Sequence, residues 1–266
     1  MTSSTAITPP AATNLTGKIA LVTGGSRNIG CETAAELARQ GADVVVTYHS
    51  SAAAAAEVVD ELERSGRRAA AIQVDLTGTG ALDRFVDDVR AQLAAWDAEG
   101  LDILVNNAGT LRIATFDAVT EDDLDAIFET NYKSLFFLTQ RLADVINDGG
   151  RIVNLGSGTA EIAFAPLVSY GPVKAALHSL TKYLAAHFGP RGITVNAVAP
   201  GGLDDDFNAL LFDEIFPPAR DYIRSNTAVG RIGMPADIGG VIGFLATDAA
   251  SFVSGAVLPI DGGYRL

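Results

Sequence analysis

Residues 19–30 read IALVTGGSRNIG, and this stretch decides the fold that the sequence predicts. The apolar run 19–22 has the length and composition of a strand buried on both faces. A glycine-rich turn, Thr23 to Gly30, follows it and leads into a helical pattern. At a strand–helix junction, glycines let the backbone approach a pyrophosphate, and the helix N-terminus offers it free N–H groups. The stretch therefore predicts a dinucleotide-binding loop, although a glycine-rich turn alone is weak support for one.

A strand–helix alternation continues along the rest of the chain. Short apolar runs, most of them rich in Val and Ile, predict further buried strands at 44–47, 70–74, 103–105, 152–155, 194–198 and 257–260. Helical patterns lie between them at 29–40, 52–65, 80–96, 121–147, 170–188 and 236–247. Such alternation implies parallel strands joined by right-handed crossovers. We expect one α/β domain over residues 16–266, a doubly wound parallel sheet of Rossmann type with about seven strands and helices on both faces. A flexible tail is expected at 1–15.

Composition limits the kind of protein. The chain has 266 residues, 48% of them hydrophobic, and no apolar run reaches the ~18 residues of a membrane helix. A net charge of -13 argues against nucleic acid as a partner. With the single cysteine Cys31 no internal disulfide can form, and three scattered histidines give no recognisable zinc site. We therefore expect no bound metal. The N-terminus lacks a basic region followed by an apolar block, so we expect a cytoplasmic protein without a secretory signal.

Ligands in such a sheet bind beyond the carboxyl ends of the strands. After the second strand, Thr47 is followed by no acidic residue that would repel a 2′-phosphate. Arg27 lies in the loop that faces this edge, and arginine suits bidentate contact with phosphate. These two observations favour NADP(H) over NAD(H), with a solvated loop charge as the alternative for Arg27. Asp75, after the third strand, either accepts from an adenine amino group or caps a turn.

The predicted cofactor contacts are the residues that follow each strand end. They comprise Gly24, Ser26, Arg27, Asn28, Ile29 and Gly30 in the first turn, Tyr48, His49 and Ser50 after the second strand, Asp75 and Leu76 after the third, Asn107, Ala108 and Gly109 after the fourth, and Pro200 and Gly201 after the sixth. The amides and small residues of 106–109 would let the backbone pass close to a ligand and tie neighbouring strands.

A second group of residues suits proton transfer. Tyr170 and Lys174 stand four apart in a helical segment, so they lie on the same face. An ammonium near a phenol lowers the phenol pKa from about 10, which prepares it to give a proton to a carbonyl oxygen. Ser157, after the fifth strand, would aim its hydroxyl at the same cleft. By itself, such a Tyr–Lys pair is more often a plain surface contact.

Local signals place this helix and raise a question about the one before it. Ser169 suits an N-cap, Pro172 fits the first turn, and Gly189-Pro190 is a stop signal. Asn131 lies inside the predicted helix 121–147, where an asparagine is mildly unfavourable. It would either bridge water or bend the helix.

Together these pieces resemble the short-chain dehydrogenase/reductase family over about residues 16–266. The matches are its glycine-rich signature at 23–30, its Asn-Asn-Ala-Gly motif at 106–109 and its Pro-Gly turn, which closes on the nicotinamide, at 200–201. The family's catalytic residues match Asn131, Ser157, Tyr170 and Lys174, with the familiar spacing of thirteen between Ser and Tyr. The tail 244–263 is similar to that of the 3-oxoacyl-acyl-carrier-protein reductase branch, which implies a homotetramer.

The resemblance implies a role for each catalytic residue. Tyr170 would donate a proton to a carbonyl, Ser157 would hold the carbonyl oxygen, and Lys174 would tune the phenol and bind the nicotinamide ribose. Asn131 would position a water that relays protons. Two departures bear on cofactor binding. Asn28 replaces the middle glycine of the signature, although asparagine tolerates positive φ. An acidic run, 204–206, replaces the usual threonine-bearing stretch.

The stretch 202–228 is predicted to be a lid over the nicotinamide. It has an unusual density of large apolar residues for a loop, some at helical spacing. The alternative is that they complete the core or a subunit contact. The expected substrate pocket comprises Ser157, Leu203, Phe207, Leu211, Phe212 and Phe216. Acidic residues at the start of the lid would repel anionic substrates.

The sequence thus predicts an NADPH-dependent reductase that transfers a hydride to a ketone, reversibly. The substrate expected is a hydrophobic ketone or a β-ketoacyl compound. The alternative is an NAD(P)-dependent sugar or secondary-alcohol dehydrogenase. A non-catalytic NADP-binding regulator would have dropped Tyr170 or Lys174, and a lyase-like relative would have replaced the glycine loop; the chain does neither.

Overall fold

A computed structural model describes residues 14–266, without the side chains of Leu210, Leu211 and Glu214. The expected tail therefore lies almost wholly outside the described residues. Leu15, which we placed in the tail, is buried in the core and donates its N–H to the carbonyl of Gln40 at 2.7 Å. Leu15 therefore belongs to the domain and not to the tail.

Seven parallel strands form one sheet in the order β3-β2-β1-β4-β5-β6-β7. The strands are β1 Ile19–Val22, β2 Asp43–Tyr48, β3 Ala69–Gln73, β4 Leu101–Asn106, β5 Ile146–Leu155, β6 Thr194–Pro200 and β7 Val257–Ile260. The chain runs outward from β1 to β3 and then starts again on the other side of β1 with β4. The carboxyl ends of β1 and β4 thus meet where the strand order reverses, and a doubly wound sheet binds its ligand at this point.

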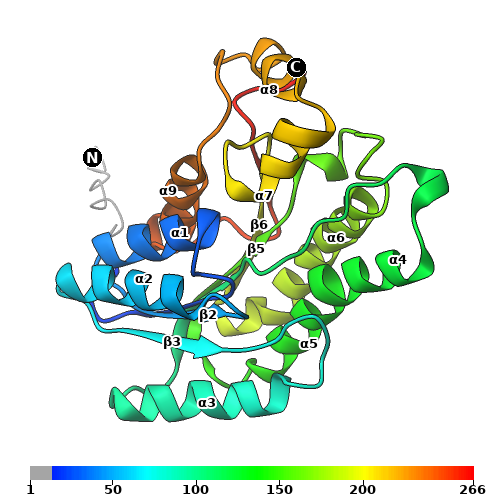
Figure 1. Cartoon of the computed structure of the whole chain (residues 1–266). Helices are drawn as coiled ribbons and strands as arrows, with labels where there is room; N and C mark the ends of the chain where they lie inside the picture. The colour runs from blue at the N-terminus through cyan, green and yellow to red at the C-terminus, as the bar shows by residue number, and fades with distance from the viewer. Residues whose placement is uncertain (1–13) are drawn as a thin grey trace, which may run out of the picture.

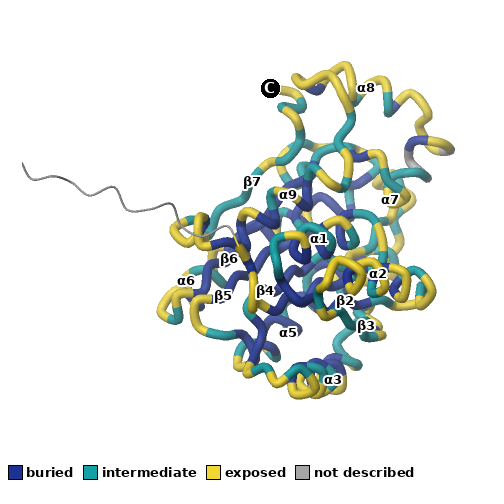
Figure 2. The backbone as a smooth tube through the Cα atoms, turned by 90° about the vertical axis from the view of Figure 1, so that its left-hand side faces the viewer, coloured by how far each residue is buried: buried dark blue, intermediate teal, exposed yellow. Residues whose placement is uncertain are grey.

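Helices cover both faces of the sheet (Figure 1). They are α1 Asn28–Arg39, α2 Ala52–Arg64, α3 Leu82–Ala95, α4 Glu121–Phe128, α5 Ser134–Arg141, α6 Tyr170–Phe188, α7 Asp206–Ala209, α8 Ala219–Ser225 and α9 Pro235–Leu245. One apolar core joins the sheet to α1, α2 and α9, and a second joins its other face to α3, α5 and α6. The buried tube in the middle of Figure 2 is this sheet, with the exposed sides of the helices around it. The predicted doubly wound fold is confirmed.

The predicted helix 121–147 is the clearest correction. The chain forms α4, a π-helical turn at Glu129–Lys133 and then α5, and β5 has already begun at Ile146. Asn131 lies in the π-turn and donates its side-chain amide to the carbonyls of Ile127 and Thr110. Asn131 therefore lies where the regular α-helical hydrogen bonding is interrupted. The helix ends early because Ile146 pairs in register with Leu101 of β4.

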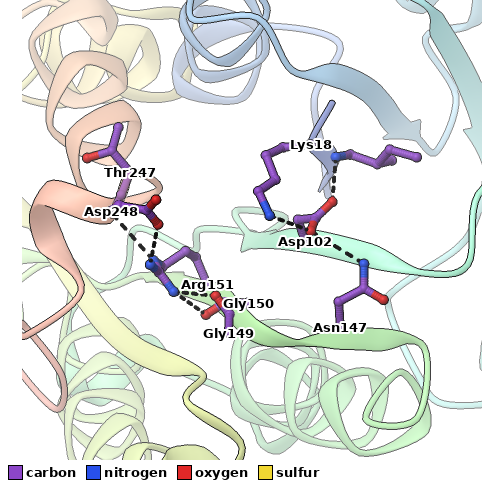
Figure 3. Close-up of polar contacts among 9 residues, drawn as sticks. Lys18, Asp102, Asn147, Gly149, Gly150, Arg151, Thr247 and Asp248 are labelled. Atoms are coloured by element: carbon purple, nitrogen blue, oxygen red, sulfur yellow. Dashed lines mark hydrogen bonds and ion pairs between the residues drawn. The ribbon is translucent and has the colours of Figure 1, made fainter. Parts of the chain in front are cut away.

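The amino ends of the strands are held together by two polar clusters, drawn in Figure 3. Asp102 of β4 accepts from the Lys18 ammonium at 3.0 Å and from the Ile19 N–H at 2.9 Å. Arg151 of β5 is buried and donates to the carbonyls of Gly149, Gly150 and Thr247 and to the Asp248 carboxylate. These contacts fix the edge opposite the candidate site.

The lid 202–228 is mostly helical and lies beyond the carboxyl ends of β5 and β6 (Figure 1). It contains α7, a π-helical stretch Leu210–Ile215 and α8, and Pro217-Pro218 lies between the last two. The C-terminal residues run back beside it, where Arg265 donates its N–H to the carbonyl of Asn226 at 2.9 Å. Within residues 14–266, no helix combines the length and apolar character needed to cross a membrane.

Candidate active site

A cavity of about 660 Å³ opens at the carboxyl end of the sheet. It runs from the glycine-rich turn past the ends of β2 to β6 to the lid. The predicted site residues that line it are Gly24, Ser26, Arg27, Asn28, Ile29, Gly30, Tyr48, His49, Ser50, Asp75, Leu76, Asn107, Ala108, Gly109, Ser157, Tyr170, Lys174, Pro200, Gly201, Leu203, Phe207, Phe212 and Phe216. The fold therefore brings nearly every predicted position to one space.

The glycine-rich turn has the backbone that a dinucleotide loop requires. Asn28 adopts φ 50°, so this asparagine accepts the left-handed conformation expected of it. A Cβ on Gly30 would lie 2.2 Å from the carbonyl oxygen of Gly24, so only glycine fits there. No side chain among the described residues caps the start of α1, so its first N–H groups are free to meet an anion.

The amides after β4 tie this turn to its neighbours, as predicted. Asn107 donates its side-chain amide to the carbonyls of Thr23 and Gly24 at 2.8 and 3.0 Å. The Thr23 hydroxyl accepts from the backbone N–H groups of Asn107 and Ala108. Asn106 donates to Asn154 of β5 at 2.9 Å, which continues the chain of contacts across the sheet. The wall behind the turn is thereby fixed on both sides.

The part of the cavity near the ends of β2 and β3 has one arginine at its rim and one carboxylate that is already hydrogen-bonded. Arg27 is exposed at the rim of the cavity, immediately before α1. Asp75 caps a turn, because its Oδ1 accepts from the N–H and hydroxyl of Thr77, and these two hydrogen bonds lower the pKa of its carboxyl. Its Oδ2 lies 3.9 Å from Nε2 of His49. Of the two readings for Asp75, the turn cap is therefore present in the structure.

Tyr170 and Lys174 share one face of α6, as the spacing predicts. The Lys174 ammonium nitrogen lies 5.4 Å from the centre of the Tyr170 ring and donates to the carbonyl of Leu155 at 2.7 Å. Both side chains are buried. Burial lowers the pKa of Lys174 to about 7. Lys174 is thereby tied to the end of β5, beside the turn that contains Ser157.

The prediction that Lys174 lowers the phenol pKa is wrong for this structure. Burial raises the pKa of Tyr170 well above its usual value, the Ser157 hydroxyl acts in the opposite direction, and the Asp205 carboxylate adds to the rise. Lys174 does not offset this rise, because a lysine with a pKa of about 7 has already lost its proton at the pH where the phenol titrates. Spacing along the helix could not reveal this degree of burial.

Ser169 occupies the expected N-cap position of α6, but its side chain makes no capping hydrogen bond. Its hydroxyl is buried and has no partner among the described residues. The first helical N–H groups are instead met from the preceding turn, where Tyr170 and Gly171 both donate to the carbonyl of Leu167. The helix begins where predicted for a different local reason.

Ser157 and Asn131 approach the cavity from two other elements. The Ser157 hydroxyl lies 2.8 Å from that of Thr159, and it accepts from the Thr159 N–H at 3.2 Å. Asn131 lies behind the cavity wall, where its buried Oδ1 faces Gly109 and has no partner within residues 14–266. An unpaired buried acceptor is unusual and is suited to an ordered water.

The lid closes the far end of the cavity with aromatic side chains. Phe212 is 2% exposed and packs against Phe164, Ile113, Ile223 and Ala219. The Phe207 ring lies 6.5 Å from that of Tyr170. Phe212 therefore both fills a small core and lines the cavity. The side chain of Leu211 lies outside the described residues.

The acidic run at the start of the lid divides into two roles. Asp204 forms an ion pair with Arg220, whose guanidinium lies 5.0 Å from the centre of the Phe212 ring. Its charge is therefore compensated. Asp205 lines the cavity, and its Oδ1 accepts from the backbone and side-chain N–H groups of Asn208 at 2.9 and 2.8 Å. Burial raises the pKa of Asp205.

Several residues of this site were not predicted individually. Phe164, Tyr264 and Arg265 line the cavity, and His178 accepts the N–H of Ser157. The spacing of His178, four residues after Lys174, could have placed it on the same helix face. Nothing in the sequence brings the C-terminal residues to the lid. No cluster of metal-binding side chains occurs in the described part of the chain.

Comparison with known proteins identifies the family. A sequence model described as enoyl-(acyl carrier protein) reductase matches residues 24–265. A probable tetrahydroxynaphthalene reductase of Zymoseptoria tritici is 35% identical over 267 residues, covering 97% of this chain and 98% of the relative. The chain belongs to the short-chain dehydrogenase/reductase family.

Solved structures of the same family have the same fold. A short-chain dehydrogenase from Burkholderia cenocepacia, in complex with NADP, has a TM-score of 0.86 and 43% identity, over 94% of this chain and 98% of that one. The angucycline C-6 ketoreductase LanV, with bound NADP, has a TM-score of 0.89 and 39% identity, over 95% of this chain and 97% of that one.

Proposed function

We propose that this protein is an NADPH-dependent ketoreductase whose substrates are hydrophobic, fused-ring aromatic ketones that carry hydroxyl groups. The observation that carries the proposal is the single cavity that joins a dinucleotide loop, a Tyr–Lys pair and an aromatic lid. A fold of this kind hosts many activities, so the argument rests on these side chains.

The residues present fit a dinucleotide. Free N–H groups at the start of α1 and the bare backbone at Gly30 suit a pyrophosphate, and Arg27 at the rim suits a 2′-phosphate. The NADP-bound relatives support this choice of cofactor. When bound, NADPH supplies the hydride of the reduction.

The protein's own part in the reaction is to hold and protonate the carbonyl oxygen. Tyr170 gives its phenolic proton to that oxygen, and its high pKa in the structure keeps it protonated until then. Ser157 donates a hydrogen bond to the same oxygen. Lys174, held by Leu155, supplies positive charge beside the phenol when it is protonated. Asn131 positions a water with its unpaired Oδ1.

The lid supports the choice of substrate class. Its aromatic side chains present flat apolar surface beside Tyr170, which suits fused rings. Asp205 uses one oxygen to hold Asn208, so the other oxygen is available to accept a substrate hydroxyl and repels anionic substrates. The named activities of the relatives, on tetrahydroxynaphthalene and angucycline substrates, are consistent with such a ligand.

A matched substrate panel tests this function. NADPH oxidation is followed with hydroxylated tetralones, 3-oxoacyl thioesters, keto-acids and keto-sugars, and we expect the tetralones to give the highest kcat/KM. Phe216→Ala should raise KM for tetralones by roughly two- to tenfold, since an aromatic pair is worth ~0.5–1.5 kcal/mol. Phe116→Ala, at an exposed residue that does not line the cavity, is the matched control.

Two outcomes would reject the proposal. A preference for keto-sugars would favour the sugar dehydrogenase alternative. NADPH binding without oxidation in the presence of any ketone would favour the non-catalytic regulator.

We also propose a cytoplasmic homotetramer. Strand β7 is at the edge of the sheet, and Phe244 and Phe252, close to it in the sequence, are exposed. Such apolar surface at a sheet edge suits contact between subunits. Light scattering that gives a stable monomer at micromolar concentration would contradict the tetramer.

A further inference from the structure

His178 is a buried histidine of α6 that the proposed reaction does not use. It stands four residues after Lys174 and eight after Tyr170, so all three lie along one face of the helix. It is 5% exposed. Its Nε2 accepts the backbone N–H of Ser157 at 3.4 Å. The ring therefore contacts the chain at the residue proposed to hold the carbonyl oxygen.

The structure leaves room for this ring at Gly156. A Cβ on Gly156 would lie 2.2 Å from Nε2 and 2.8 Å from Cδ2 of His178, so any other residue would displace the imidazole. On its other side, Gly156 donates its N–H to the carbonyl of Val198 at 2.7 Å. The turn that contains Ser157 is thus held between β6 and the histidine.

The hydrogen bond defines the state of the ring. Because Nε2 accepts, the imidazole is neutral and its proton lies on Nδ1. Nδ1 is buried without a hydrogen-bond partner among the described residues, and the nearest carboxylate oxygen, Oε1 of Glu161, is 3.7 Å away. Glu161 is exposed and lies in the turn that follows Ser157.

Three charged groups act on the ring, and burial acts more strongly than any of them. Burial lowers the pKa of His178 below its ordinary value of 6.5. The Glu161 carboxylate opposes this effect, whereas Lys174 and Lys182 on the same helix add to it. His178 is therefore neutral at pH 7 and becomes charged only on the acid side.

We propose that neutral His178 is a positioning residue that holds Ser157 in its reactive place, and that protonation of the ring releases it. When Nε2 is protonated it becomes a donor that faces the N–H donor of Ser157, so the hydrogen bond is lost and two donors repel. The inference rests on the role proposed for Ser157. A shift of about 1 Å in such a group can cost about a hundredfold in rate.

Two substitutions of His178 separate its role as a hydrogen-bond acceptor from its ability to take up a proton. The glutamine carbonyl of His178→Gln can accept the Ser157 N–H but cannot become charged, so we expect near-normal kcat at pH 7 and loss of the acid limb of the pH profile. His178→Leu offers no acceptor, so kcat at pH 7 should fall at least about tenfold, with the Kd of NADPH unchanged. The exposed His187→Gln on the same helix is the control.

A third substitution tests the electrostatics without touching the ring. Removing the Glu161 charge by Glu161→Gln lowers the pKa of His178, so the acid limb should move to lower pH. The position is exposed, so the change should leave the fold intact. All variants are compared by kcat and KM from pH 5 to 8, together with NADPH fluorescence titrations.

Any one of three results overturns the inference. They are a wild-type kcat in His178→Leu, an acid limb of the pH profile that is unchanged in His178→Gln, and an acid limb that does not move in Glu161→Gln. Ser157→Ala is measured alongside: if it keeps wild-type kcat, the role proposed for Ser157 fails. If Ser157→Ala loses activity while His178→Leu keeps it, the inference alone fails.

Discussion

Replacing Arg27 by alanine should remove the preference for NADPH over NADH. Arg27 lies at the rim of the cavity immediately before α1, and the end of β2 beside it carries Thr47, Tyr48 and His49 but no acid. The guanidinium would contact the 2′-phosphate, a group that NADH lacks. Only the affinity for NADPH should therefore respond to the substitution.

The size of the effect follows from the exposure of Arg27. A hydrogen bond to a charged group is worth ~1.5–3 kcal/mol, and contact with water screens part of that. Because Arg27 is exposed, we expect ~1–2 kcal/mol, which is about five- to thirtyfold in the ratio of the two Kd values. The effect should shrink as salt is added.

Cofactor fluorescence titration of both nucleotides measures this ratio. Arg39→Ala is the matched control, since that guanidinium lies at the far end of the helix that Arg27 precedes and is bound to Glu36. Wild-type protein that binds NADH as tightly as NADPH would refute the reasoning. So would an Arg27→Ala variant in which both affinities fall equally.

Three other perturbations test the fold and the site. In urea denaturation, Arg151→Met should lower the free energy of unfolding by ~1–3 kcal/mol, because three carbonyls lose their donor while the Asp248 carboxylate is exposed to water; a change near that of exposed Arg84→Met contradicts this. The pKa of Lys174 is about 7 in the folded protein and 10.5 in the unfolded chain, so the unfolded state binds more protons between these two pH values. The free energy of unfolding of wild type, relative to that of Lys174→Met, should therefore rise by ~1 kcal/mol per pH unit over this range. A difference that stays constant with pH contradicts this. Asn28→Gly should keep NADPH affinity, whereas Asn28→Val should lose it, because valine resists φ 50°; equal Kd values contradict this.

The sequence carried enough information for the sheet and for most of the site. Buried strands and the glycine-rich turn are local signals, and parallel topology brings every strand end to one edge. Spacing also placed Tyr170 and Lys174 on one helix face, because residues four apart in a helix always share one. These features depend on short stretches of chain.

What the sequence did not reveal depends on contacts between distant segments. The rise in the Tyr170 pKa comes from burial in a cluster that includes Ile127 and Leu167, and from Asp205, thirty-five residues away. Asp204 is compensated by Arg220, sixteen residues along the chain. The predicted helix 121–147 extends too far, because its last apolar residues continue a helical spacing but pack at the start of β5. These residues are Leu142, Val145 and Ile146. Three-dimensional packing decides each of these.

The kinetics of Tyr170→Phe test the central claim most directly. The variant keeps the ring in its buried place and removes only the hydroxyl that would give its proton to the carbonyl oxygen. With NADPH and a hydroxylated tetralone, kcat should fall at least ~10²-fold, the usual scale for a general acid, while the Kd of NADPH stays unchanged. Tyr183→Phe, at an exposed position of the same helix, should behave as wild type. Near-normal turnover in Tyr170→Phe would contradict the account.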